Sequence, residues 1–140
     1  LCERGVCVVI CDHFGSGDKW RNVATSAVHD IIAPNSLGDF LGRHASAVQS
    51  IIHMGAISST TETDVDLIIE NNLRLSIDLW DWCTARRVSY IYASSAATYG
   101  DGSQGFDDDS SVEGLAKLQP LNAYGWSKHA FDRRTARLLA

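Results

Sequence analysis

The sequence predicts an α/β fold in which parallel strands form a doubly wound sheet, with helices packed on its faces. Three observations support this prediction. Apolar runs of strand length recur along the chain, and a continuous apolar run is typical of a strand buried on both faces. Stretches with helical periodicity lie between these runs, and this alternation indicates βαβ units. Small or polar residues follow three of the strands, at the edge where such sheets bind ligands.

The first part of the chain contains a predicted strand, a second short apolar run and a predicted helix. Residues 6–11, VCVVIC, form a continuous apolar run that ends at Asp12 and opens into a loop rich in glycine and serine. A second apolar run, SAVHDII, covers residues 26–32. Residues 34–46 have the pattern of a helix, and Pro34 suits its first turn because the missing N–H would be unpaired there anyway.

The next part repeats this alternation with a longer helix. Residues 48–54, VQSIIHM, predict a strand that is closed by a glycine and an alanine. The longest helical pattern covers 63–87, and Thr63 or Asp64 suits its N-cap. Residues 88–93, VSYIYA, predict another strand, which leads into two serines.

The two ends of the chain predict a domain that continues beyond them. After a polar loop at 101–111, the last helix begins near Asn122 and its pattern continues to the end. Residues 1–5 have the pattern of a helix tail with its C-terminal glycine, and the run at 6–11 follows directly. A dinucleotide-binding fold begins instead with a strand and a G-x-G-x-x-G-type turn. We therefore expect residues 1–140 to be part of an NAD(P)-binding domain, without its first strand, its glycine-rich loop and a C-terminal substrate domain.

Composition and charge exclude several classes of protein. At 140 residues the chain is one domain or less, with 45% hydrophobic and 21% charged residues, as in soluble globular proteins. Its net charge of −5 does not suit nucleic acid or an anionic membrane, and no apolar run approaches the roughly 20 residues of a membrane span. The four cysteines lack C-x-x-C spacing and the five histidines form no ligand pattern, so we expect no metal site. Free thiols favour the reducing cytoplasm.

Asp12 marks a candidate cofactor site at the exit of the first predicted strand. A carboxylate there can accept hydrogen bonds from an adenosine ribose, which favours the 2′-OH of NAD. Lys19 and Arg21 follow in the loop, and their charges suit the 2′-phosphate of NADP instead. The residues by themselves leave both cofactors open.

The stretch NAYGWSK contains a tyrosine and a lysine that share one face of the last predicted helix. Tyr124 and Lys128 are four residues apart, which is about one helical turn. A tyrosine hydroxyl, with an ordinary pKa of about 10, is a poor acid or base at neutral pH. An ammonium one turn away stabilises the phenolate and makes the hydroxyl a usable proton shuttle. The structural alternative is a half-buried aromatic ring with a lysine over it.

Ser94 and Ser95 follow the strand predicted at 88–93 and add a hydroxyl group to this pair. Serine, tyrosine and lysine together suit hydride transfer. In such a reaction the tyrosine takes the alcohol proton while a nicotinamide takes the hydride, and the serine hydrogen-bonds the reacting oxygen. A hydrolase is disfavoured because the sequence Ser-Ser-Ala-Ala lacks the glycines of a nucleophile elbow.

A serine loop after a strand, followed later by Y-x-x-x-K, resembles the extended short-chain dehydrogenase/reductase superfamily and its NAD-dependent epimerase/dehydratase family. Four stretches resemble the ADP-glyceromanno-heptose 6-epimerases within it: HMGAISSTTETD, ENN, YASSAATYGDG and PLNAYGWSKHAFD. SSTTE is the discriminating piece, since related 4-epimerases share SSA and Y-x-x-x-K but do not usually have that motif. The resemblance implies a Rossmann-like doubly wound sheet, truncated at both ends of this chain.

The resemblance also implies roles for individual residues. Tyr124 would be the catalytic acid/base, Lys128 its partner, and Ser95 the active-site hydroxyl. The residues implied in cofactor binding are Asp12, His13, Lys19, Asp30, Met54, Gly55, Ala56, Ile57, Ser58, Asn71 and Lys128. The residues implied on the substrate side are Ser58, Ser59, Thr60 and Ser95.

The activity implied is the interconversion of ADP-D-glycero- and ADP-L-glycero-D-manno-heptose at C6, in the synthesis of lipopolysaccharide core precursors. The sugar would be oxidised transiently with bound NADP, although NAD is also possible, and the hydride would return to the opposite face. A second base, a lysine, would lie beyond this chain, so the fragment itself would be inactive, and the full-length protein is expected to be a homo-oligomer. The alternatives are another nucleotide-sugar 4-epimerase or dehydratase, or a non-catalytic NAD(P)-binding protein.

Overall fold

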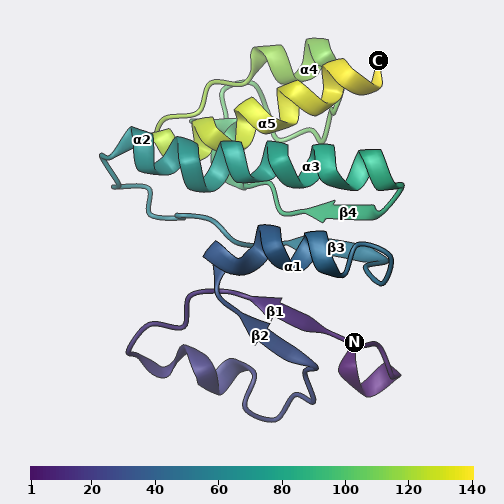
Figure 1. Cartoon of the computed structure of the whole chain (residues 1–140). Helices are drawn as coiled ribbons and strands as arrows, with labels where there is room; N and C mark the ends of the chain where they lie inside the picture. The colour runs from purple at the N-terminus through teal and green to yellow at the C-terminus, as the bar shows by residue number, and fades with distance from the viewer. The chain divides into compact units, whose positions relative to one another are not determined.

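The computed structural model describes all residues, 1–140, and the chain folds into two compact units (Figure 1). The first unit is Leu1–Val48 and the second is Gln49–Ala140. Each unit contains one pair of parallel strands, β1 with β2 and β3 with β4. The prediction of an α/β fold with parallel strands is therefore confirmed at the level of each pair. No helix combines the length and hydropathy that crossing a membrane requires.

The N-terminal unit is built from short elements around the pair β1–β2. Its elements in order are the 3-10 helix η1 (Cys2–Arg4), strand β1 (Val9–Cys11), the 3-10 helix η2 (Asp18–Asn22), strand β2 (Asp30–Ile32), the 3-10 turn η3 (Pro34–Ser36) and helix α1 (Leu37–Arg43). The strand pair is in register from Val9 opposite Asp30 to Cys11 opposite Ile32. Strand β1 is shorter than the strand predicted at 6–11 but lies inside it, and β2 lies inside the apolar run at 26–32.

Two local predictions for this unit are confirmed. Gly5 closes η1 with a φ of 73°, a left-handed conformation that glycine adopts without strain. Pro34 stands in the first turn of η3, which runs on into α1, so the predicted helix begins where the proline indicated. The helix ends at Arg43, before the predicted boundary.

The C-terminal unit is a βαβ crossover extended by two further helices. Its elements in order are strand β3 (Ser50–His53), helix α2 (Val65–Ile68), the π-helical segment η4 (Ile69–Arg74), helix α3 (Leu75–Arg86), strand β4 (Ser89–Tyr92), the 3-10 turn η5 (Ala96–Tyr99), and helices α4 (Val112–Lys117) and α5 (Ala123–Leu139). β3 and β4 are parallel, in register from Ser50 opposite Ser89 to His53 opposite Tyr92.

The predicted long helix is continuous but changes its winding in the middle. The Asp64 side chain accepts a hydrogen bond from the Leu67 N–H at 2.9 Å, which confirms the predicted cap. The segment η4 then winds as a π-helix, a form that is rare and often occurs at functional sites. The Ser76 hydroxyl donates to the Asn72 carbonyl oxygen at 2.5 Å across the junction with α3.

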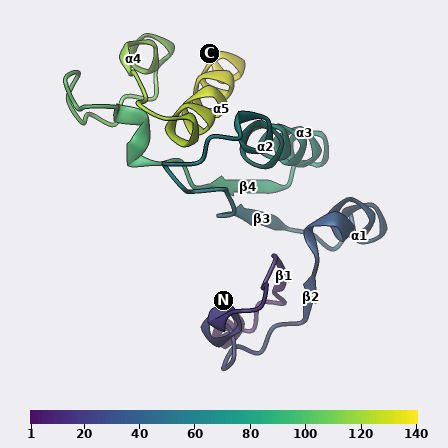
Figure 2. The ribbon, with the colours of Figure 1, turned by 90° about the vertical axis from the view of Figure 1, so that its left-hand side faces the viewer.

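Helices α3 and α5 pack against β4 (Figure 2). The contact is largely aromatic, with Phe131 packed on Tyr92 at 4.6 Å between ring centroids and edge-on against Trp80. On the opposite face Ile52 and Ile91 are 47% and 55% exposed. In this unit the helices therefore pack on one face of the strand pair.

Helix α4 was not predicted, and its sequence explains why. It has only six residues, it follows an acidic loop, and Gly114 interrupts its helical propensity. The Ser111 hydroxyl caps it by accepting from the Gly114 N–H at 2.9 Å. A Cβ at Gly114 would meet the Asp109 carboxylate, so a larger residue here would require that side chain to move.

Candidate active site

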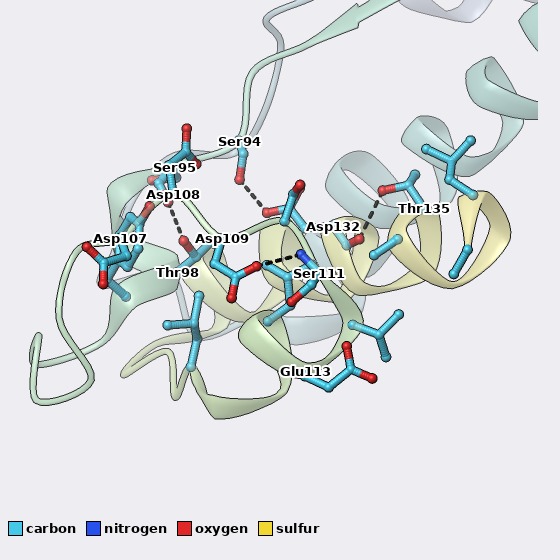
Figure 3. A pocket seen from close by; sticks show the side chains of 18 of the residues that line it. Ser94, Ser95, Thr98, Asp107, Asp108, Asp109, Ser111, Glu113, Asp132 and Thr135 are labelled. Carbon is cyan, nitrogen blue, oxygen red and sulfur yellow. Dashed lines mark hydrogen bonds between the residues drawn. The ribbon is translucent and has the colours of Figure 1, made fainter.

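The exit of β4 places two serines in different hydrogen-bond environments. The Ser95 hydroxyl accepts from the Ala97 N–H at 3.2 Å and so caps η5, and its carbonyl oxygen accepts from the Thr98 hydroxyl at 2.7 Å. The Ser94 hydroxyl donates to Asp132 Oδ2 on α5 at 2.5 Å (Figure 3). The turn that carries Ser95 is thus fixed from both sides.

Gly125 explains how α5 approaches this turn so closely. The Asn122 side chain caps α5 by accepting from the Gly125 N–H at 2.8 Å. A Cβ at Gly125 would lie 2.6 Å from the Ala97 carbonyl oxygen, so no larger residue is accommodated without a shift of backbone. Tyr124 precedes this point of closest approach, and Ser95 lies two residues before Ala97. Gly125 therefore allows the first turn of α5, which contains Tyr124, to pack against the turn that follows Ser95.

Lys128 is a buried ammonium at the exit of β4. Its side chain is 2% exposed, and its Nζ donates to the Ala93 carbonyl oxygen at 3.0 Å. The same Nζ lies 4.5 Å above the Tyr92 ring, a cation–π contact. Burial lowers the pKa of Lys128 below its ordinary value of 10.5, and the charge of Asp132 opposes that shift. Because the lysine stacks on Tyr92, the structural alternative of a lysine over the Tyr124 ring is not the contact observed.

Asn72 connects the exit of β3 to α5, and sequence reasoning missed it. Its Oδ1 accepts from the Ile57 N–H at 2.8 Å, while its Nδ2 donates to the Ile57 carbonyl oxygen at 3.0 Å and to Ser127 Oγ at 3.1 Å. Ser127 in turn donates to the Tyr124 carbonyl oxygen at 2.7 Å. Asn72 thereby holds the predicted cofactor loop to the helix that carries Tyr124 and Lys128.

The predicted residue Asn71 is placed differently. Its side chain is exposed, and its amide donates to the Leu67 carbonyl oxygen at 2.8 Å within the helix. The helical phase contained the signal, since Asn72 is four residues after the buried Ile68 and four before the buried Ser76.

The loop after β3 contains the other predicted cofactor and sugar contacts. Met54 and Gly55 are exposed, Ala56 and Ile57 are half-buried, and the segment 58–60 is exposed. Within it only Ile57 is fixed by the hydrogen bonds to Asn72 described above. This loop is therefore accessible and is anchored in its middle at Ile57. Its other predicted contact residues are Met54, Gly55, Ala56, Ser58, Ser59 and Thr60.

His53, at the end of β3, adds an unusual buried group next to this loop. Its Nδ1 lies 2.8 Å from the Tyr90 hydroxyl, and its Nε2 is buried without a partner. Burial, and secondarily the charge of Lys128, lowers the pKa of His53 from 6.5 to about 4. The imidazole is therefore neutral at physiological pH.

In the N-terminal unit the exit of β1 brings together three predicted residues. Lys19 Nζ lies 2.6 Å from Asp12 Oδ1 and donates to the His13 carbonyl oxygen at 3.0 Å. Arg21 instead pairs with Asp18 at 3.2 Å. Asp30 is not part of this group, because it begins β2 opposite Val9, at the amino end of the strand pair. Its carboxylate accepts from the Ile31 N–H at 2.8 Å.

A cavity of about 960 Å³ lies in the C-terminal unit beside the serine turn (Figure 3). Ser94, Ser95 and Asp132 line one side, and the acidic segment 107–111 with Glu113 lines another. No lysine or arginine lines it, so its chemistry suits hydroxyl groups better than phosphates. Tyr124 and Lys128 are not among its lining residues. No three histidine, cysteine or acidic side chains are arranged to hold a metal ion.

The chain is similar to one protein family and to named members of it. A sequence model of the NAD dependent epimerase/dehydratase family matches residues 1–138. The ADP-L-glycero-D-manno-heptose-6-epimerase of Fusobacterium nucleatum is 45% identical over 135 residues, covering 94% of this chain. The enzyme of that name from Nitratidesulfovibrio vulgaris is 42% identical over the same length and coverage. The chain spans 41% of the length of each of these relatives.

Two solved structures share the fold. The crystal structure of Helicobacter pylori ADP-L-glycero-D-manno-heptose-6-epimerase matches with a TM-score of 0.76 at 24% identity, over 94% of this chain and 42% of that one. The Bordetella bronchiseptica enzyme WbmG, solved in complex with NAD and UDP, matches with a TM-score of 0.64 at 15% identity, over 99% and 43% of the two chains. These likenesses confirm the predicted Rossmann-like α/β fold class.

Proposed function

The chain belongs to the NAD dependent epimerase/dehydratase family, and from this premise we propose that its complete protein is an ADP-glyceromanno-heptose 6-epimerase. Two relatives with 45% and 42% identity have that name, and the motifs on which the resemblance rests lie inside the matched residues. The observation that carries the proposal is Lys128, buried at the exit of β4 one turn after Tyr124 and bonded to the backbone just before the two serines.

The residues of the chain suit a nicotinamide dinucleotide, the cofactor of this family. The Asp12 carboxylate at the exit of β1 is a ribose acceptor, and the Lys19 ammonium beside it is a partner for phosphate. Because Lys19 neutralises Asp12, the pair does not repel a 2′-phosphate, so we propose NADP rather than NAD. Substituting Lys19→Ala is expected to weaken NADP binding about tenfold while NAD binding changes less. Isothermal titration measures both affinities, Arg21→Ala is the matched control, and equal losses for the two cofactors would contradict the assignment.

In the proposed reaction, side chains of this chain transfer the proton of the C6 hydroxyl and hydrogen-bond the oxygen at C6. A nicotinamide cofactor, when bound, would provide a hydride acceptor next to the sugar carbon. The Tyr124 phenolate takes the proton of the C6 hydroxyl as that carbon becomes a ketone. Ser95 donates a hydrogen bond to the reacting oxygen. Lys128 stabilises the negative charge on Tyr124 while it is deprotonated. Epimerisation would be complete when the hydride returns to the opposite face of C6 and the ketone oxygen takes up a proton, which gives the alcohol of inverted configuration.

The test uses the protein at its natural length with its cofactor. It is incubated with ADP-D-glycero-D-manno-heptose, and the configuration at C6 is followed by proton NMR. We expect conversion to the L-glycero epimer, with a loss in kcat of about 10²–10⁴ for Tyr124→Phe. The matched control is Trp126→Phe, two residues along the same helix on its exposed side. Retained activity in Tyr124→Phe would place the proton shuttle elsewhere.

Failure of the wild-type protein to convert this sugar, with NADP bound, would move the substrate to another nucleotide sugar. A 4-epimerase would then be detected with UDP-galactose in the same assay. We also propose that the complete protein acts in the cytoplasm, in lipopolysaccharide core precursor synthesis, as a homo-oligomer. The four free cysteines suit such a reducing compartment.

A further inference from the structure

Asp132 lies on the same helix as Tyr124 and Lys128, the two residues of α5 that the proposed chemistry uses. Tyr124, Lys128 and Asp132 follow each other at intervals of four residues on α5, so they occupy one face of the helix in successive turns. Asp132 is the last residue of the stretch PLNAYGWSKHAFD, and the resemblance assigned it no functional role. Its carboxylate accepts the Ser94 hydroxyl at 2.5 Å (Figure 3).

Two consecutive residues at the exit of β4 are therefore bonded to two consecutive turns of α5. Ala93 accepts from Lys128 at 3.0 Å, and Ser94 donates to Asp132 at 2.5 Å. Ser95 follows directly and begins η5. Because two contacts connect adjacent residues to successive turns of α5, they restrict the position of the β4 exit relative to α5 more than either contact does by itself.

The surroundings of Lys128 leave Asp132 as its counter-charge. The titratable groups around the lysine are Tyr92 on β4, His53 on β3 and Asp132 on α5. His53 is neutral, as described above, and burial raises the pKa of Tyr92 so that its phenol remains protonated. On the side of η4 and α3, the neighbouring side chains Asn72 and Ser76 carry no charge.

We propose that Asp132 is a positioning residue for the proposed reaction, which keeps the buried Lys128 in its ammonium form and, through Ser94, holds the turn that presents Ser95. The inference rests on the function proposed above. Asp132 would act through Lys128 and Ser94, so it need not contact substrate or cofactor itself. Burial raises the pKa of Asp132, while the Ser94 hydroxyl and the Lys128 charge oppose that rise and favour the carboxylate.

The experiment follows the ionisation of Lys128 in the full-length protein with its cofactor. Lysines are labelled with carbon-13 at Cε, the Lys128 signal is assigned from its absence in Lys128→Arg, and its shift is titrated with pH. In Asp132→Asn, which keeps an oxygen acceptor for Ser94 but loses the charge, we expect Lys128 to lose its proton at a lower pH than in the wild type. Glu113→Gln, which removes a carboxylate from the same cavity, is the matched control and is expected to titrate like the wild type.

Activity gives the second measurement. For Asp132→Asn we expect kcat to fall about tenfold relative to the wild type near pH 9, and less than about threefold near pH 6.5, because only the ammonium form supports Tyr124. Ser94→Ala keeps the charge, so its kcat is expected to fall about fivefold at every pH without a displaced profile. Restoration of the wild-type profile by Asp132→Glu supports the charge as the cause.

The outcomes separate this inference from the proposed function. If the wild-type protein does not epimerise the heptose, the function fails, but the Lys128 titration still decides the role of Asp132. An unchanged Lys128 titration in Asp132→Asn overturns the inference. If that variant does not fold, carbon-13 labelling of aspartate Cγ in the wild type replaces it. The Lys128 signal must then shift over the pH range in which Asp132 takes up its proton, and a Lys128 signal that does not respond also overturns the inference.

Discussion

Acidification should destabilise the C-terminal unit through one residue, His53. This side chain is 7% exposed at the end of β3, with Nδ1 bonded to the Tyr90 hydroxyl and Nε2 buried without a partner. Protonation would place a cation in this apolar environment, near the Lys128 ammonium that already disfavours it. The perturbation is therefore a fall in pH from about 7 to about 4, compared between the wild type and His53→Gln.

The magnitude follows from linkage. In the unfolded chain the histidine takes up its proton near its ordinary pKa of 6.5, whereas in the folded chain the pKa of His53 is lowered to about 4. Between these values the unfolded state binds more protons, so the free energy of unfolding falls as the pH falls. A difference of about 2.5 pH units, at ~1.4 kcal/mol each, corresponds to about 3 kcal/mol. The folded state retains this stability above pH 6.5 and has lost it near pH 4.

The assay is urea unfolding of the chain at several pH values, followed by tryptophan fluorescence. A Trp20→Phe background removes the tryptophan of the N-terminal unit, so that the signal reports the C-terminal unit. Other carboxylates titrate in the same range, and the comparison with His53→Gln cancels their contribution. We expect the wild type to lose about 3 kcal/mol more than His53→Gln between pH 7 and pH 4. The matched control is His29→Gln, which removes an exposed histidine.

Equal losses of stability in the wild type and in His53→Gln would refute the reasoning. Such a result would mean that the folded state accepts the proton on His53 without cost. The imidazole would then have to be hydrated when protonated, and the buried environment of β3 described above would not hold in solution.

Two further substitutions test how α5 is held. In Gly125→Ala the new Cβ meets the Ala97 carbonyl oxygen at 2.6 Å, so we expect a loss of about 1–3 kcal/mol in urea unfolding, although alanine is the better helix former. A stabilised Gly125→Ala would contradict the close approach. Asn72→Ala leaves the backbone groups of Ile57 unpaired, and we expect a loss of about 2–4 kcal/mol in the same measurement, against less than about 0.5 kcal/mol for Asn71→Ala. Similar losses for the two asparagines would contradict the assignment of Asn72.

Features that depend on local spacing were predictable from the sequence. Tyr124 and Lys128 share a helix face because they are four residues apart, and Ser95 follows a strand because its apolar run ends just before it. The N-cap role of Asp64 is likewise a local signal. The tertiary fold then placed these residues where the strand and helix patterns indicated.

Contacts between residues far apart in sequence were not predictable in this way. Asp132 meets Ser94 across 38 positions, and Asn72 meets Ser127 across 55. No local period encodes either pair, and each depends on how α5 packs against the other elements. The position of Asp30 also depends on pairing, since it begins β2 opposite Val9. The register of the strand pair decides this, and an apolar run does not specify register.

The polar contacts of α5 explain why its aromatic packing would not suffice for the proposed chemistry. Burial of Phe131 against Tyr92 stabilises the helix, but apolar burial is non-directional and tolerates rotation about the helix axis. A rotation by one residue, about 100°, would turn Lys128 away from the exit of β4. Contacts at Gly125, Ser127 and Asp132 hold the helix against three different neighbours, namely η5, η4 and the exit of β4. Because each needs a particular rotation, together they select the one in which Lys128 faces the exit of β4, and this requirement accounts for polar groups in an otherwise apolar interface.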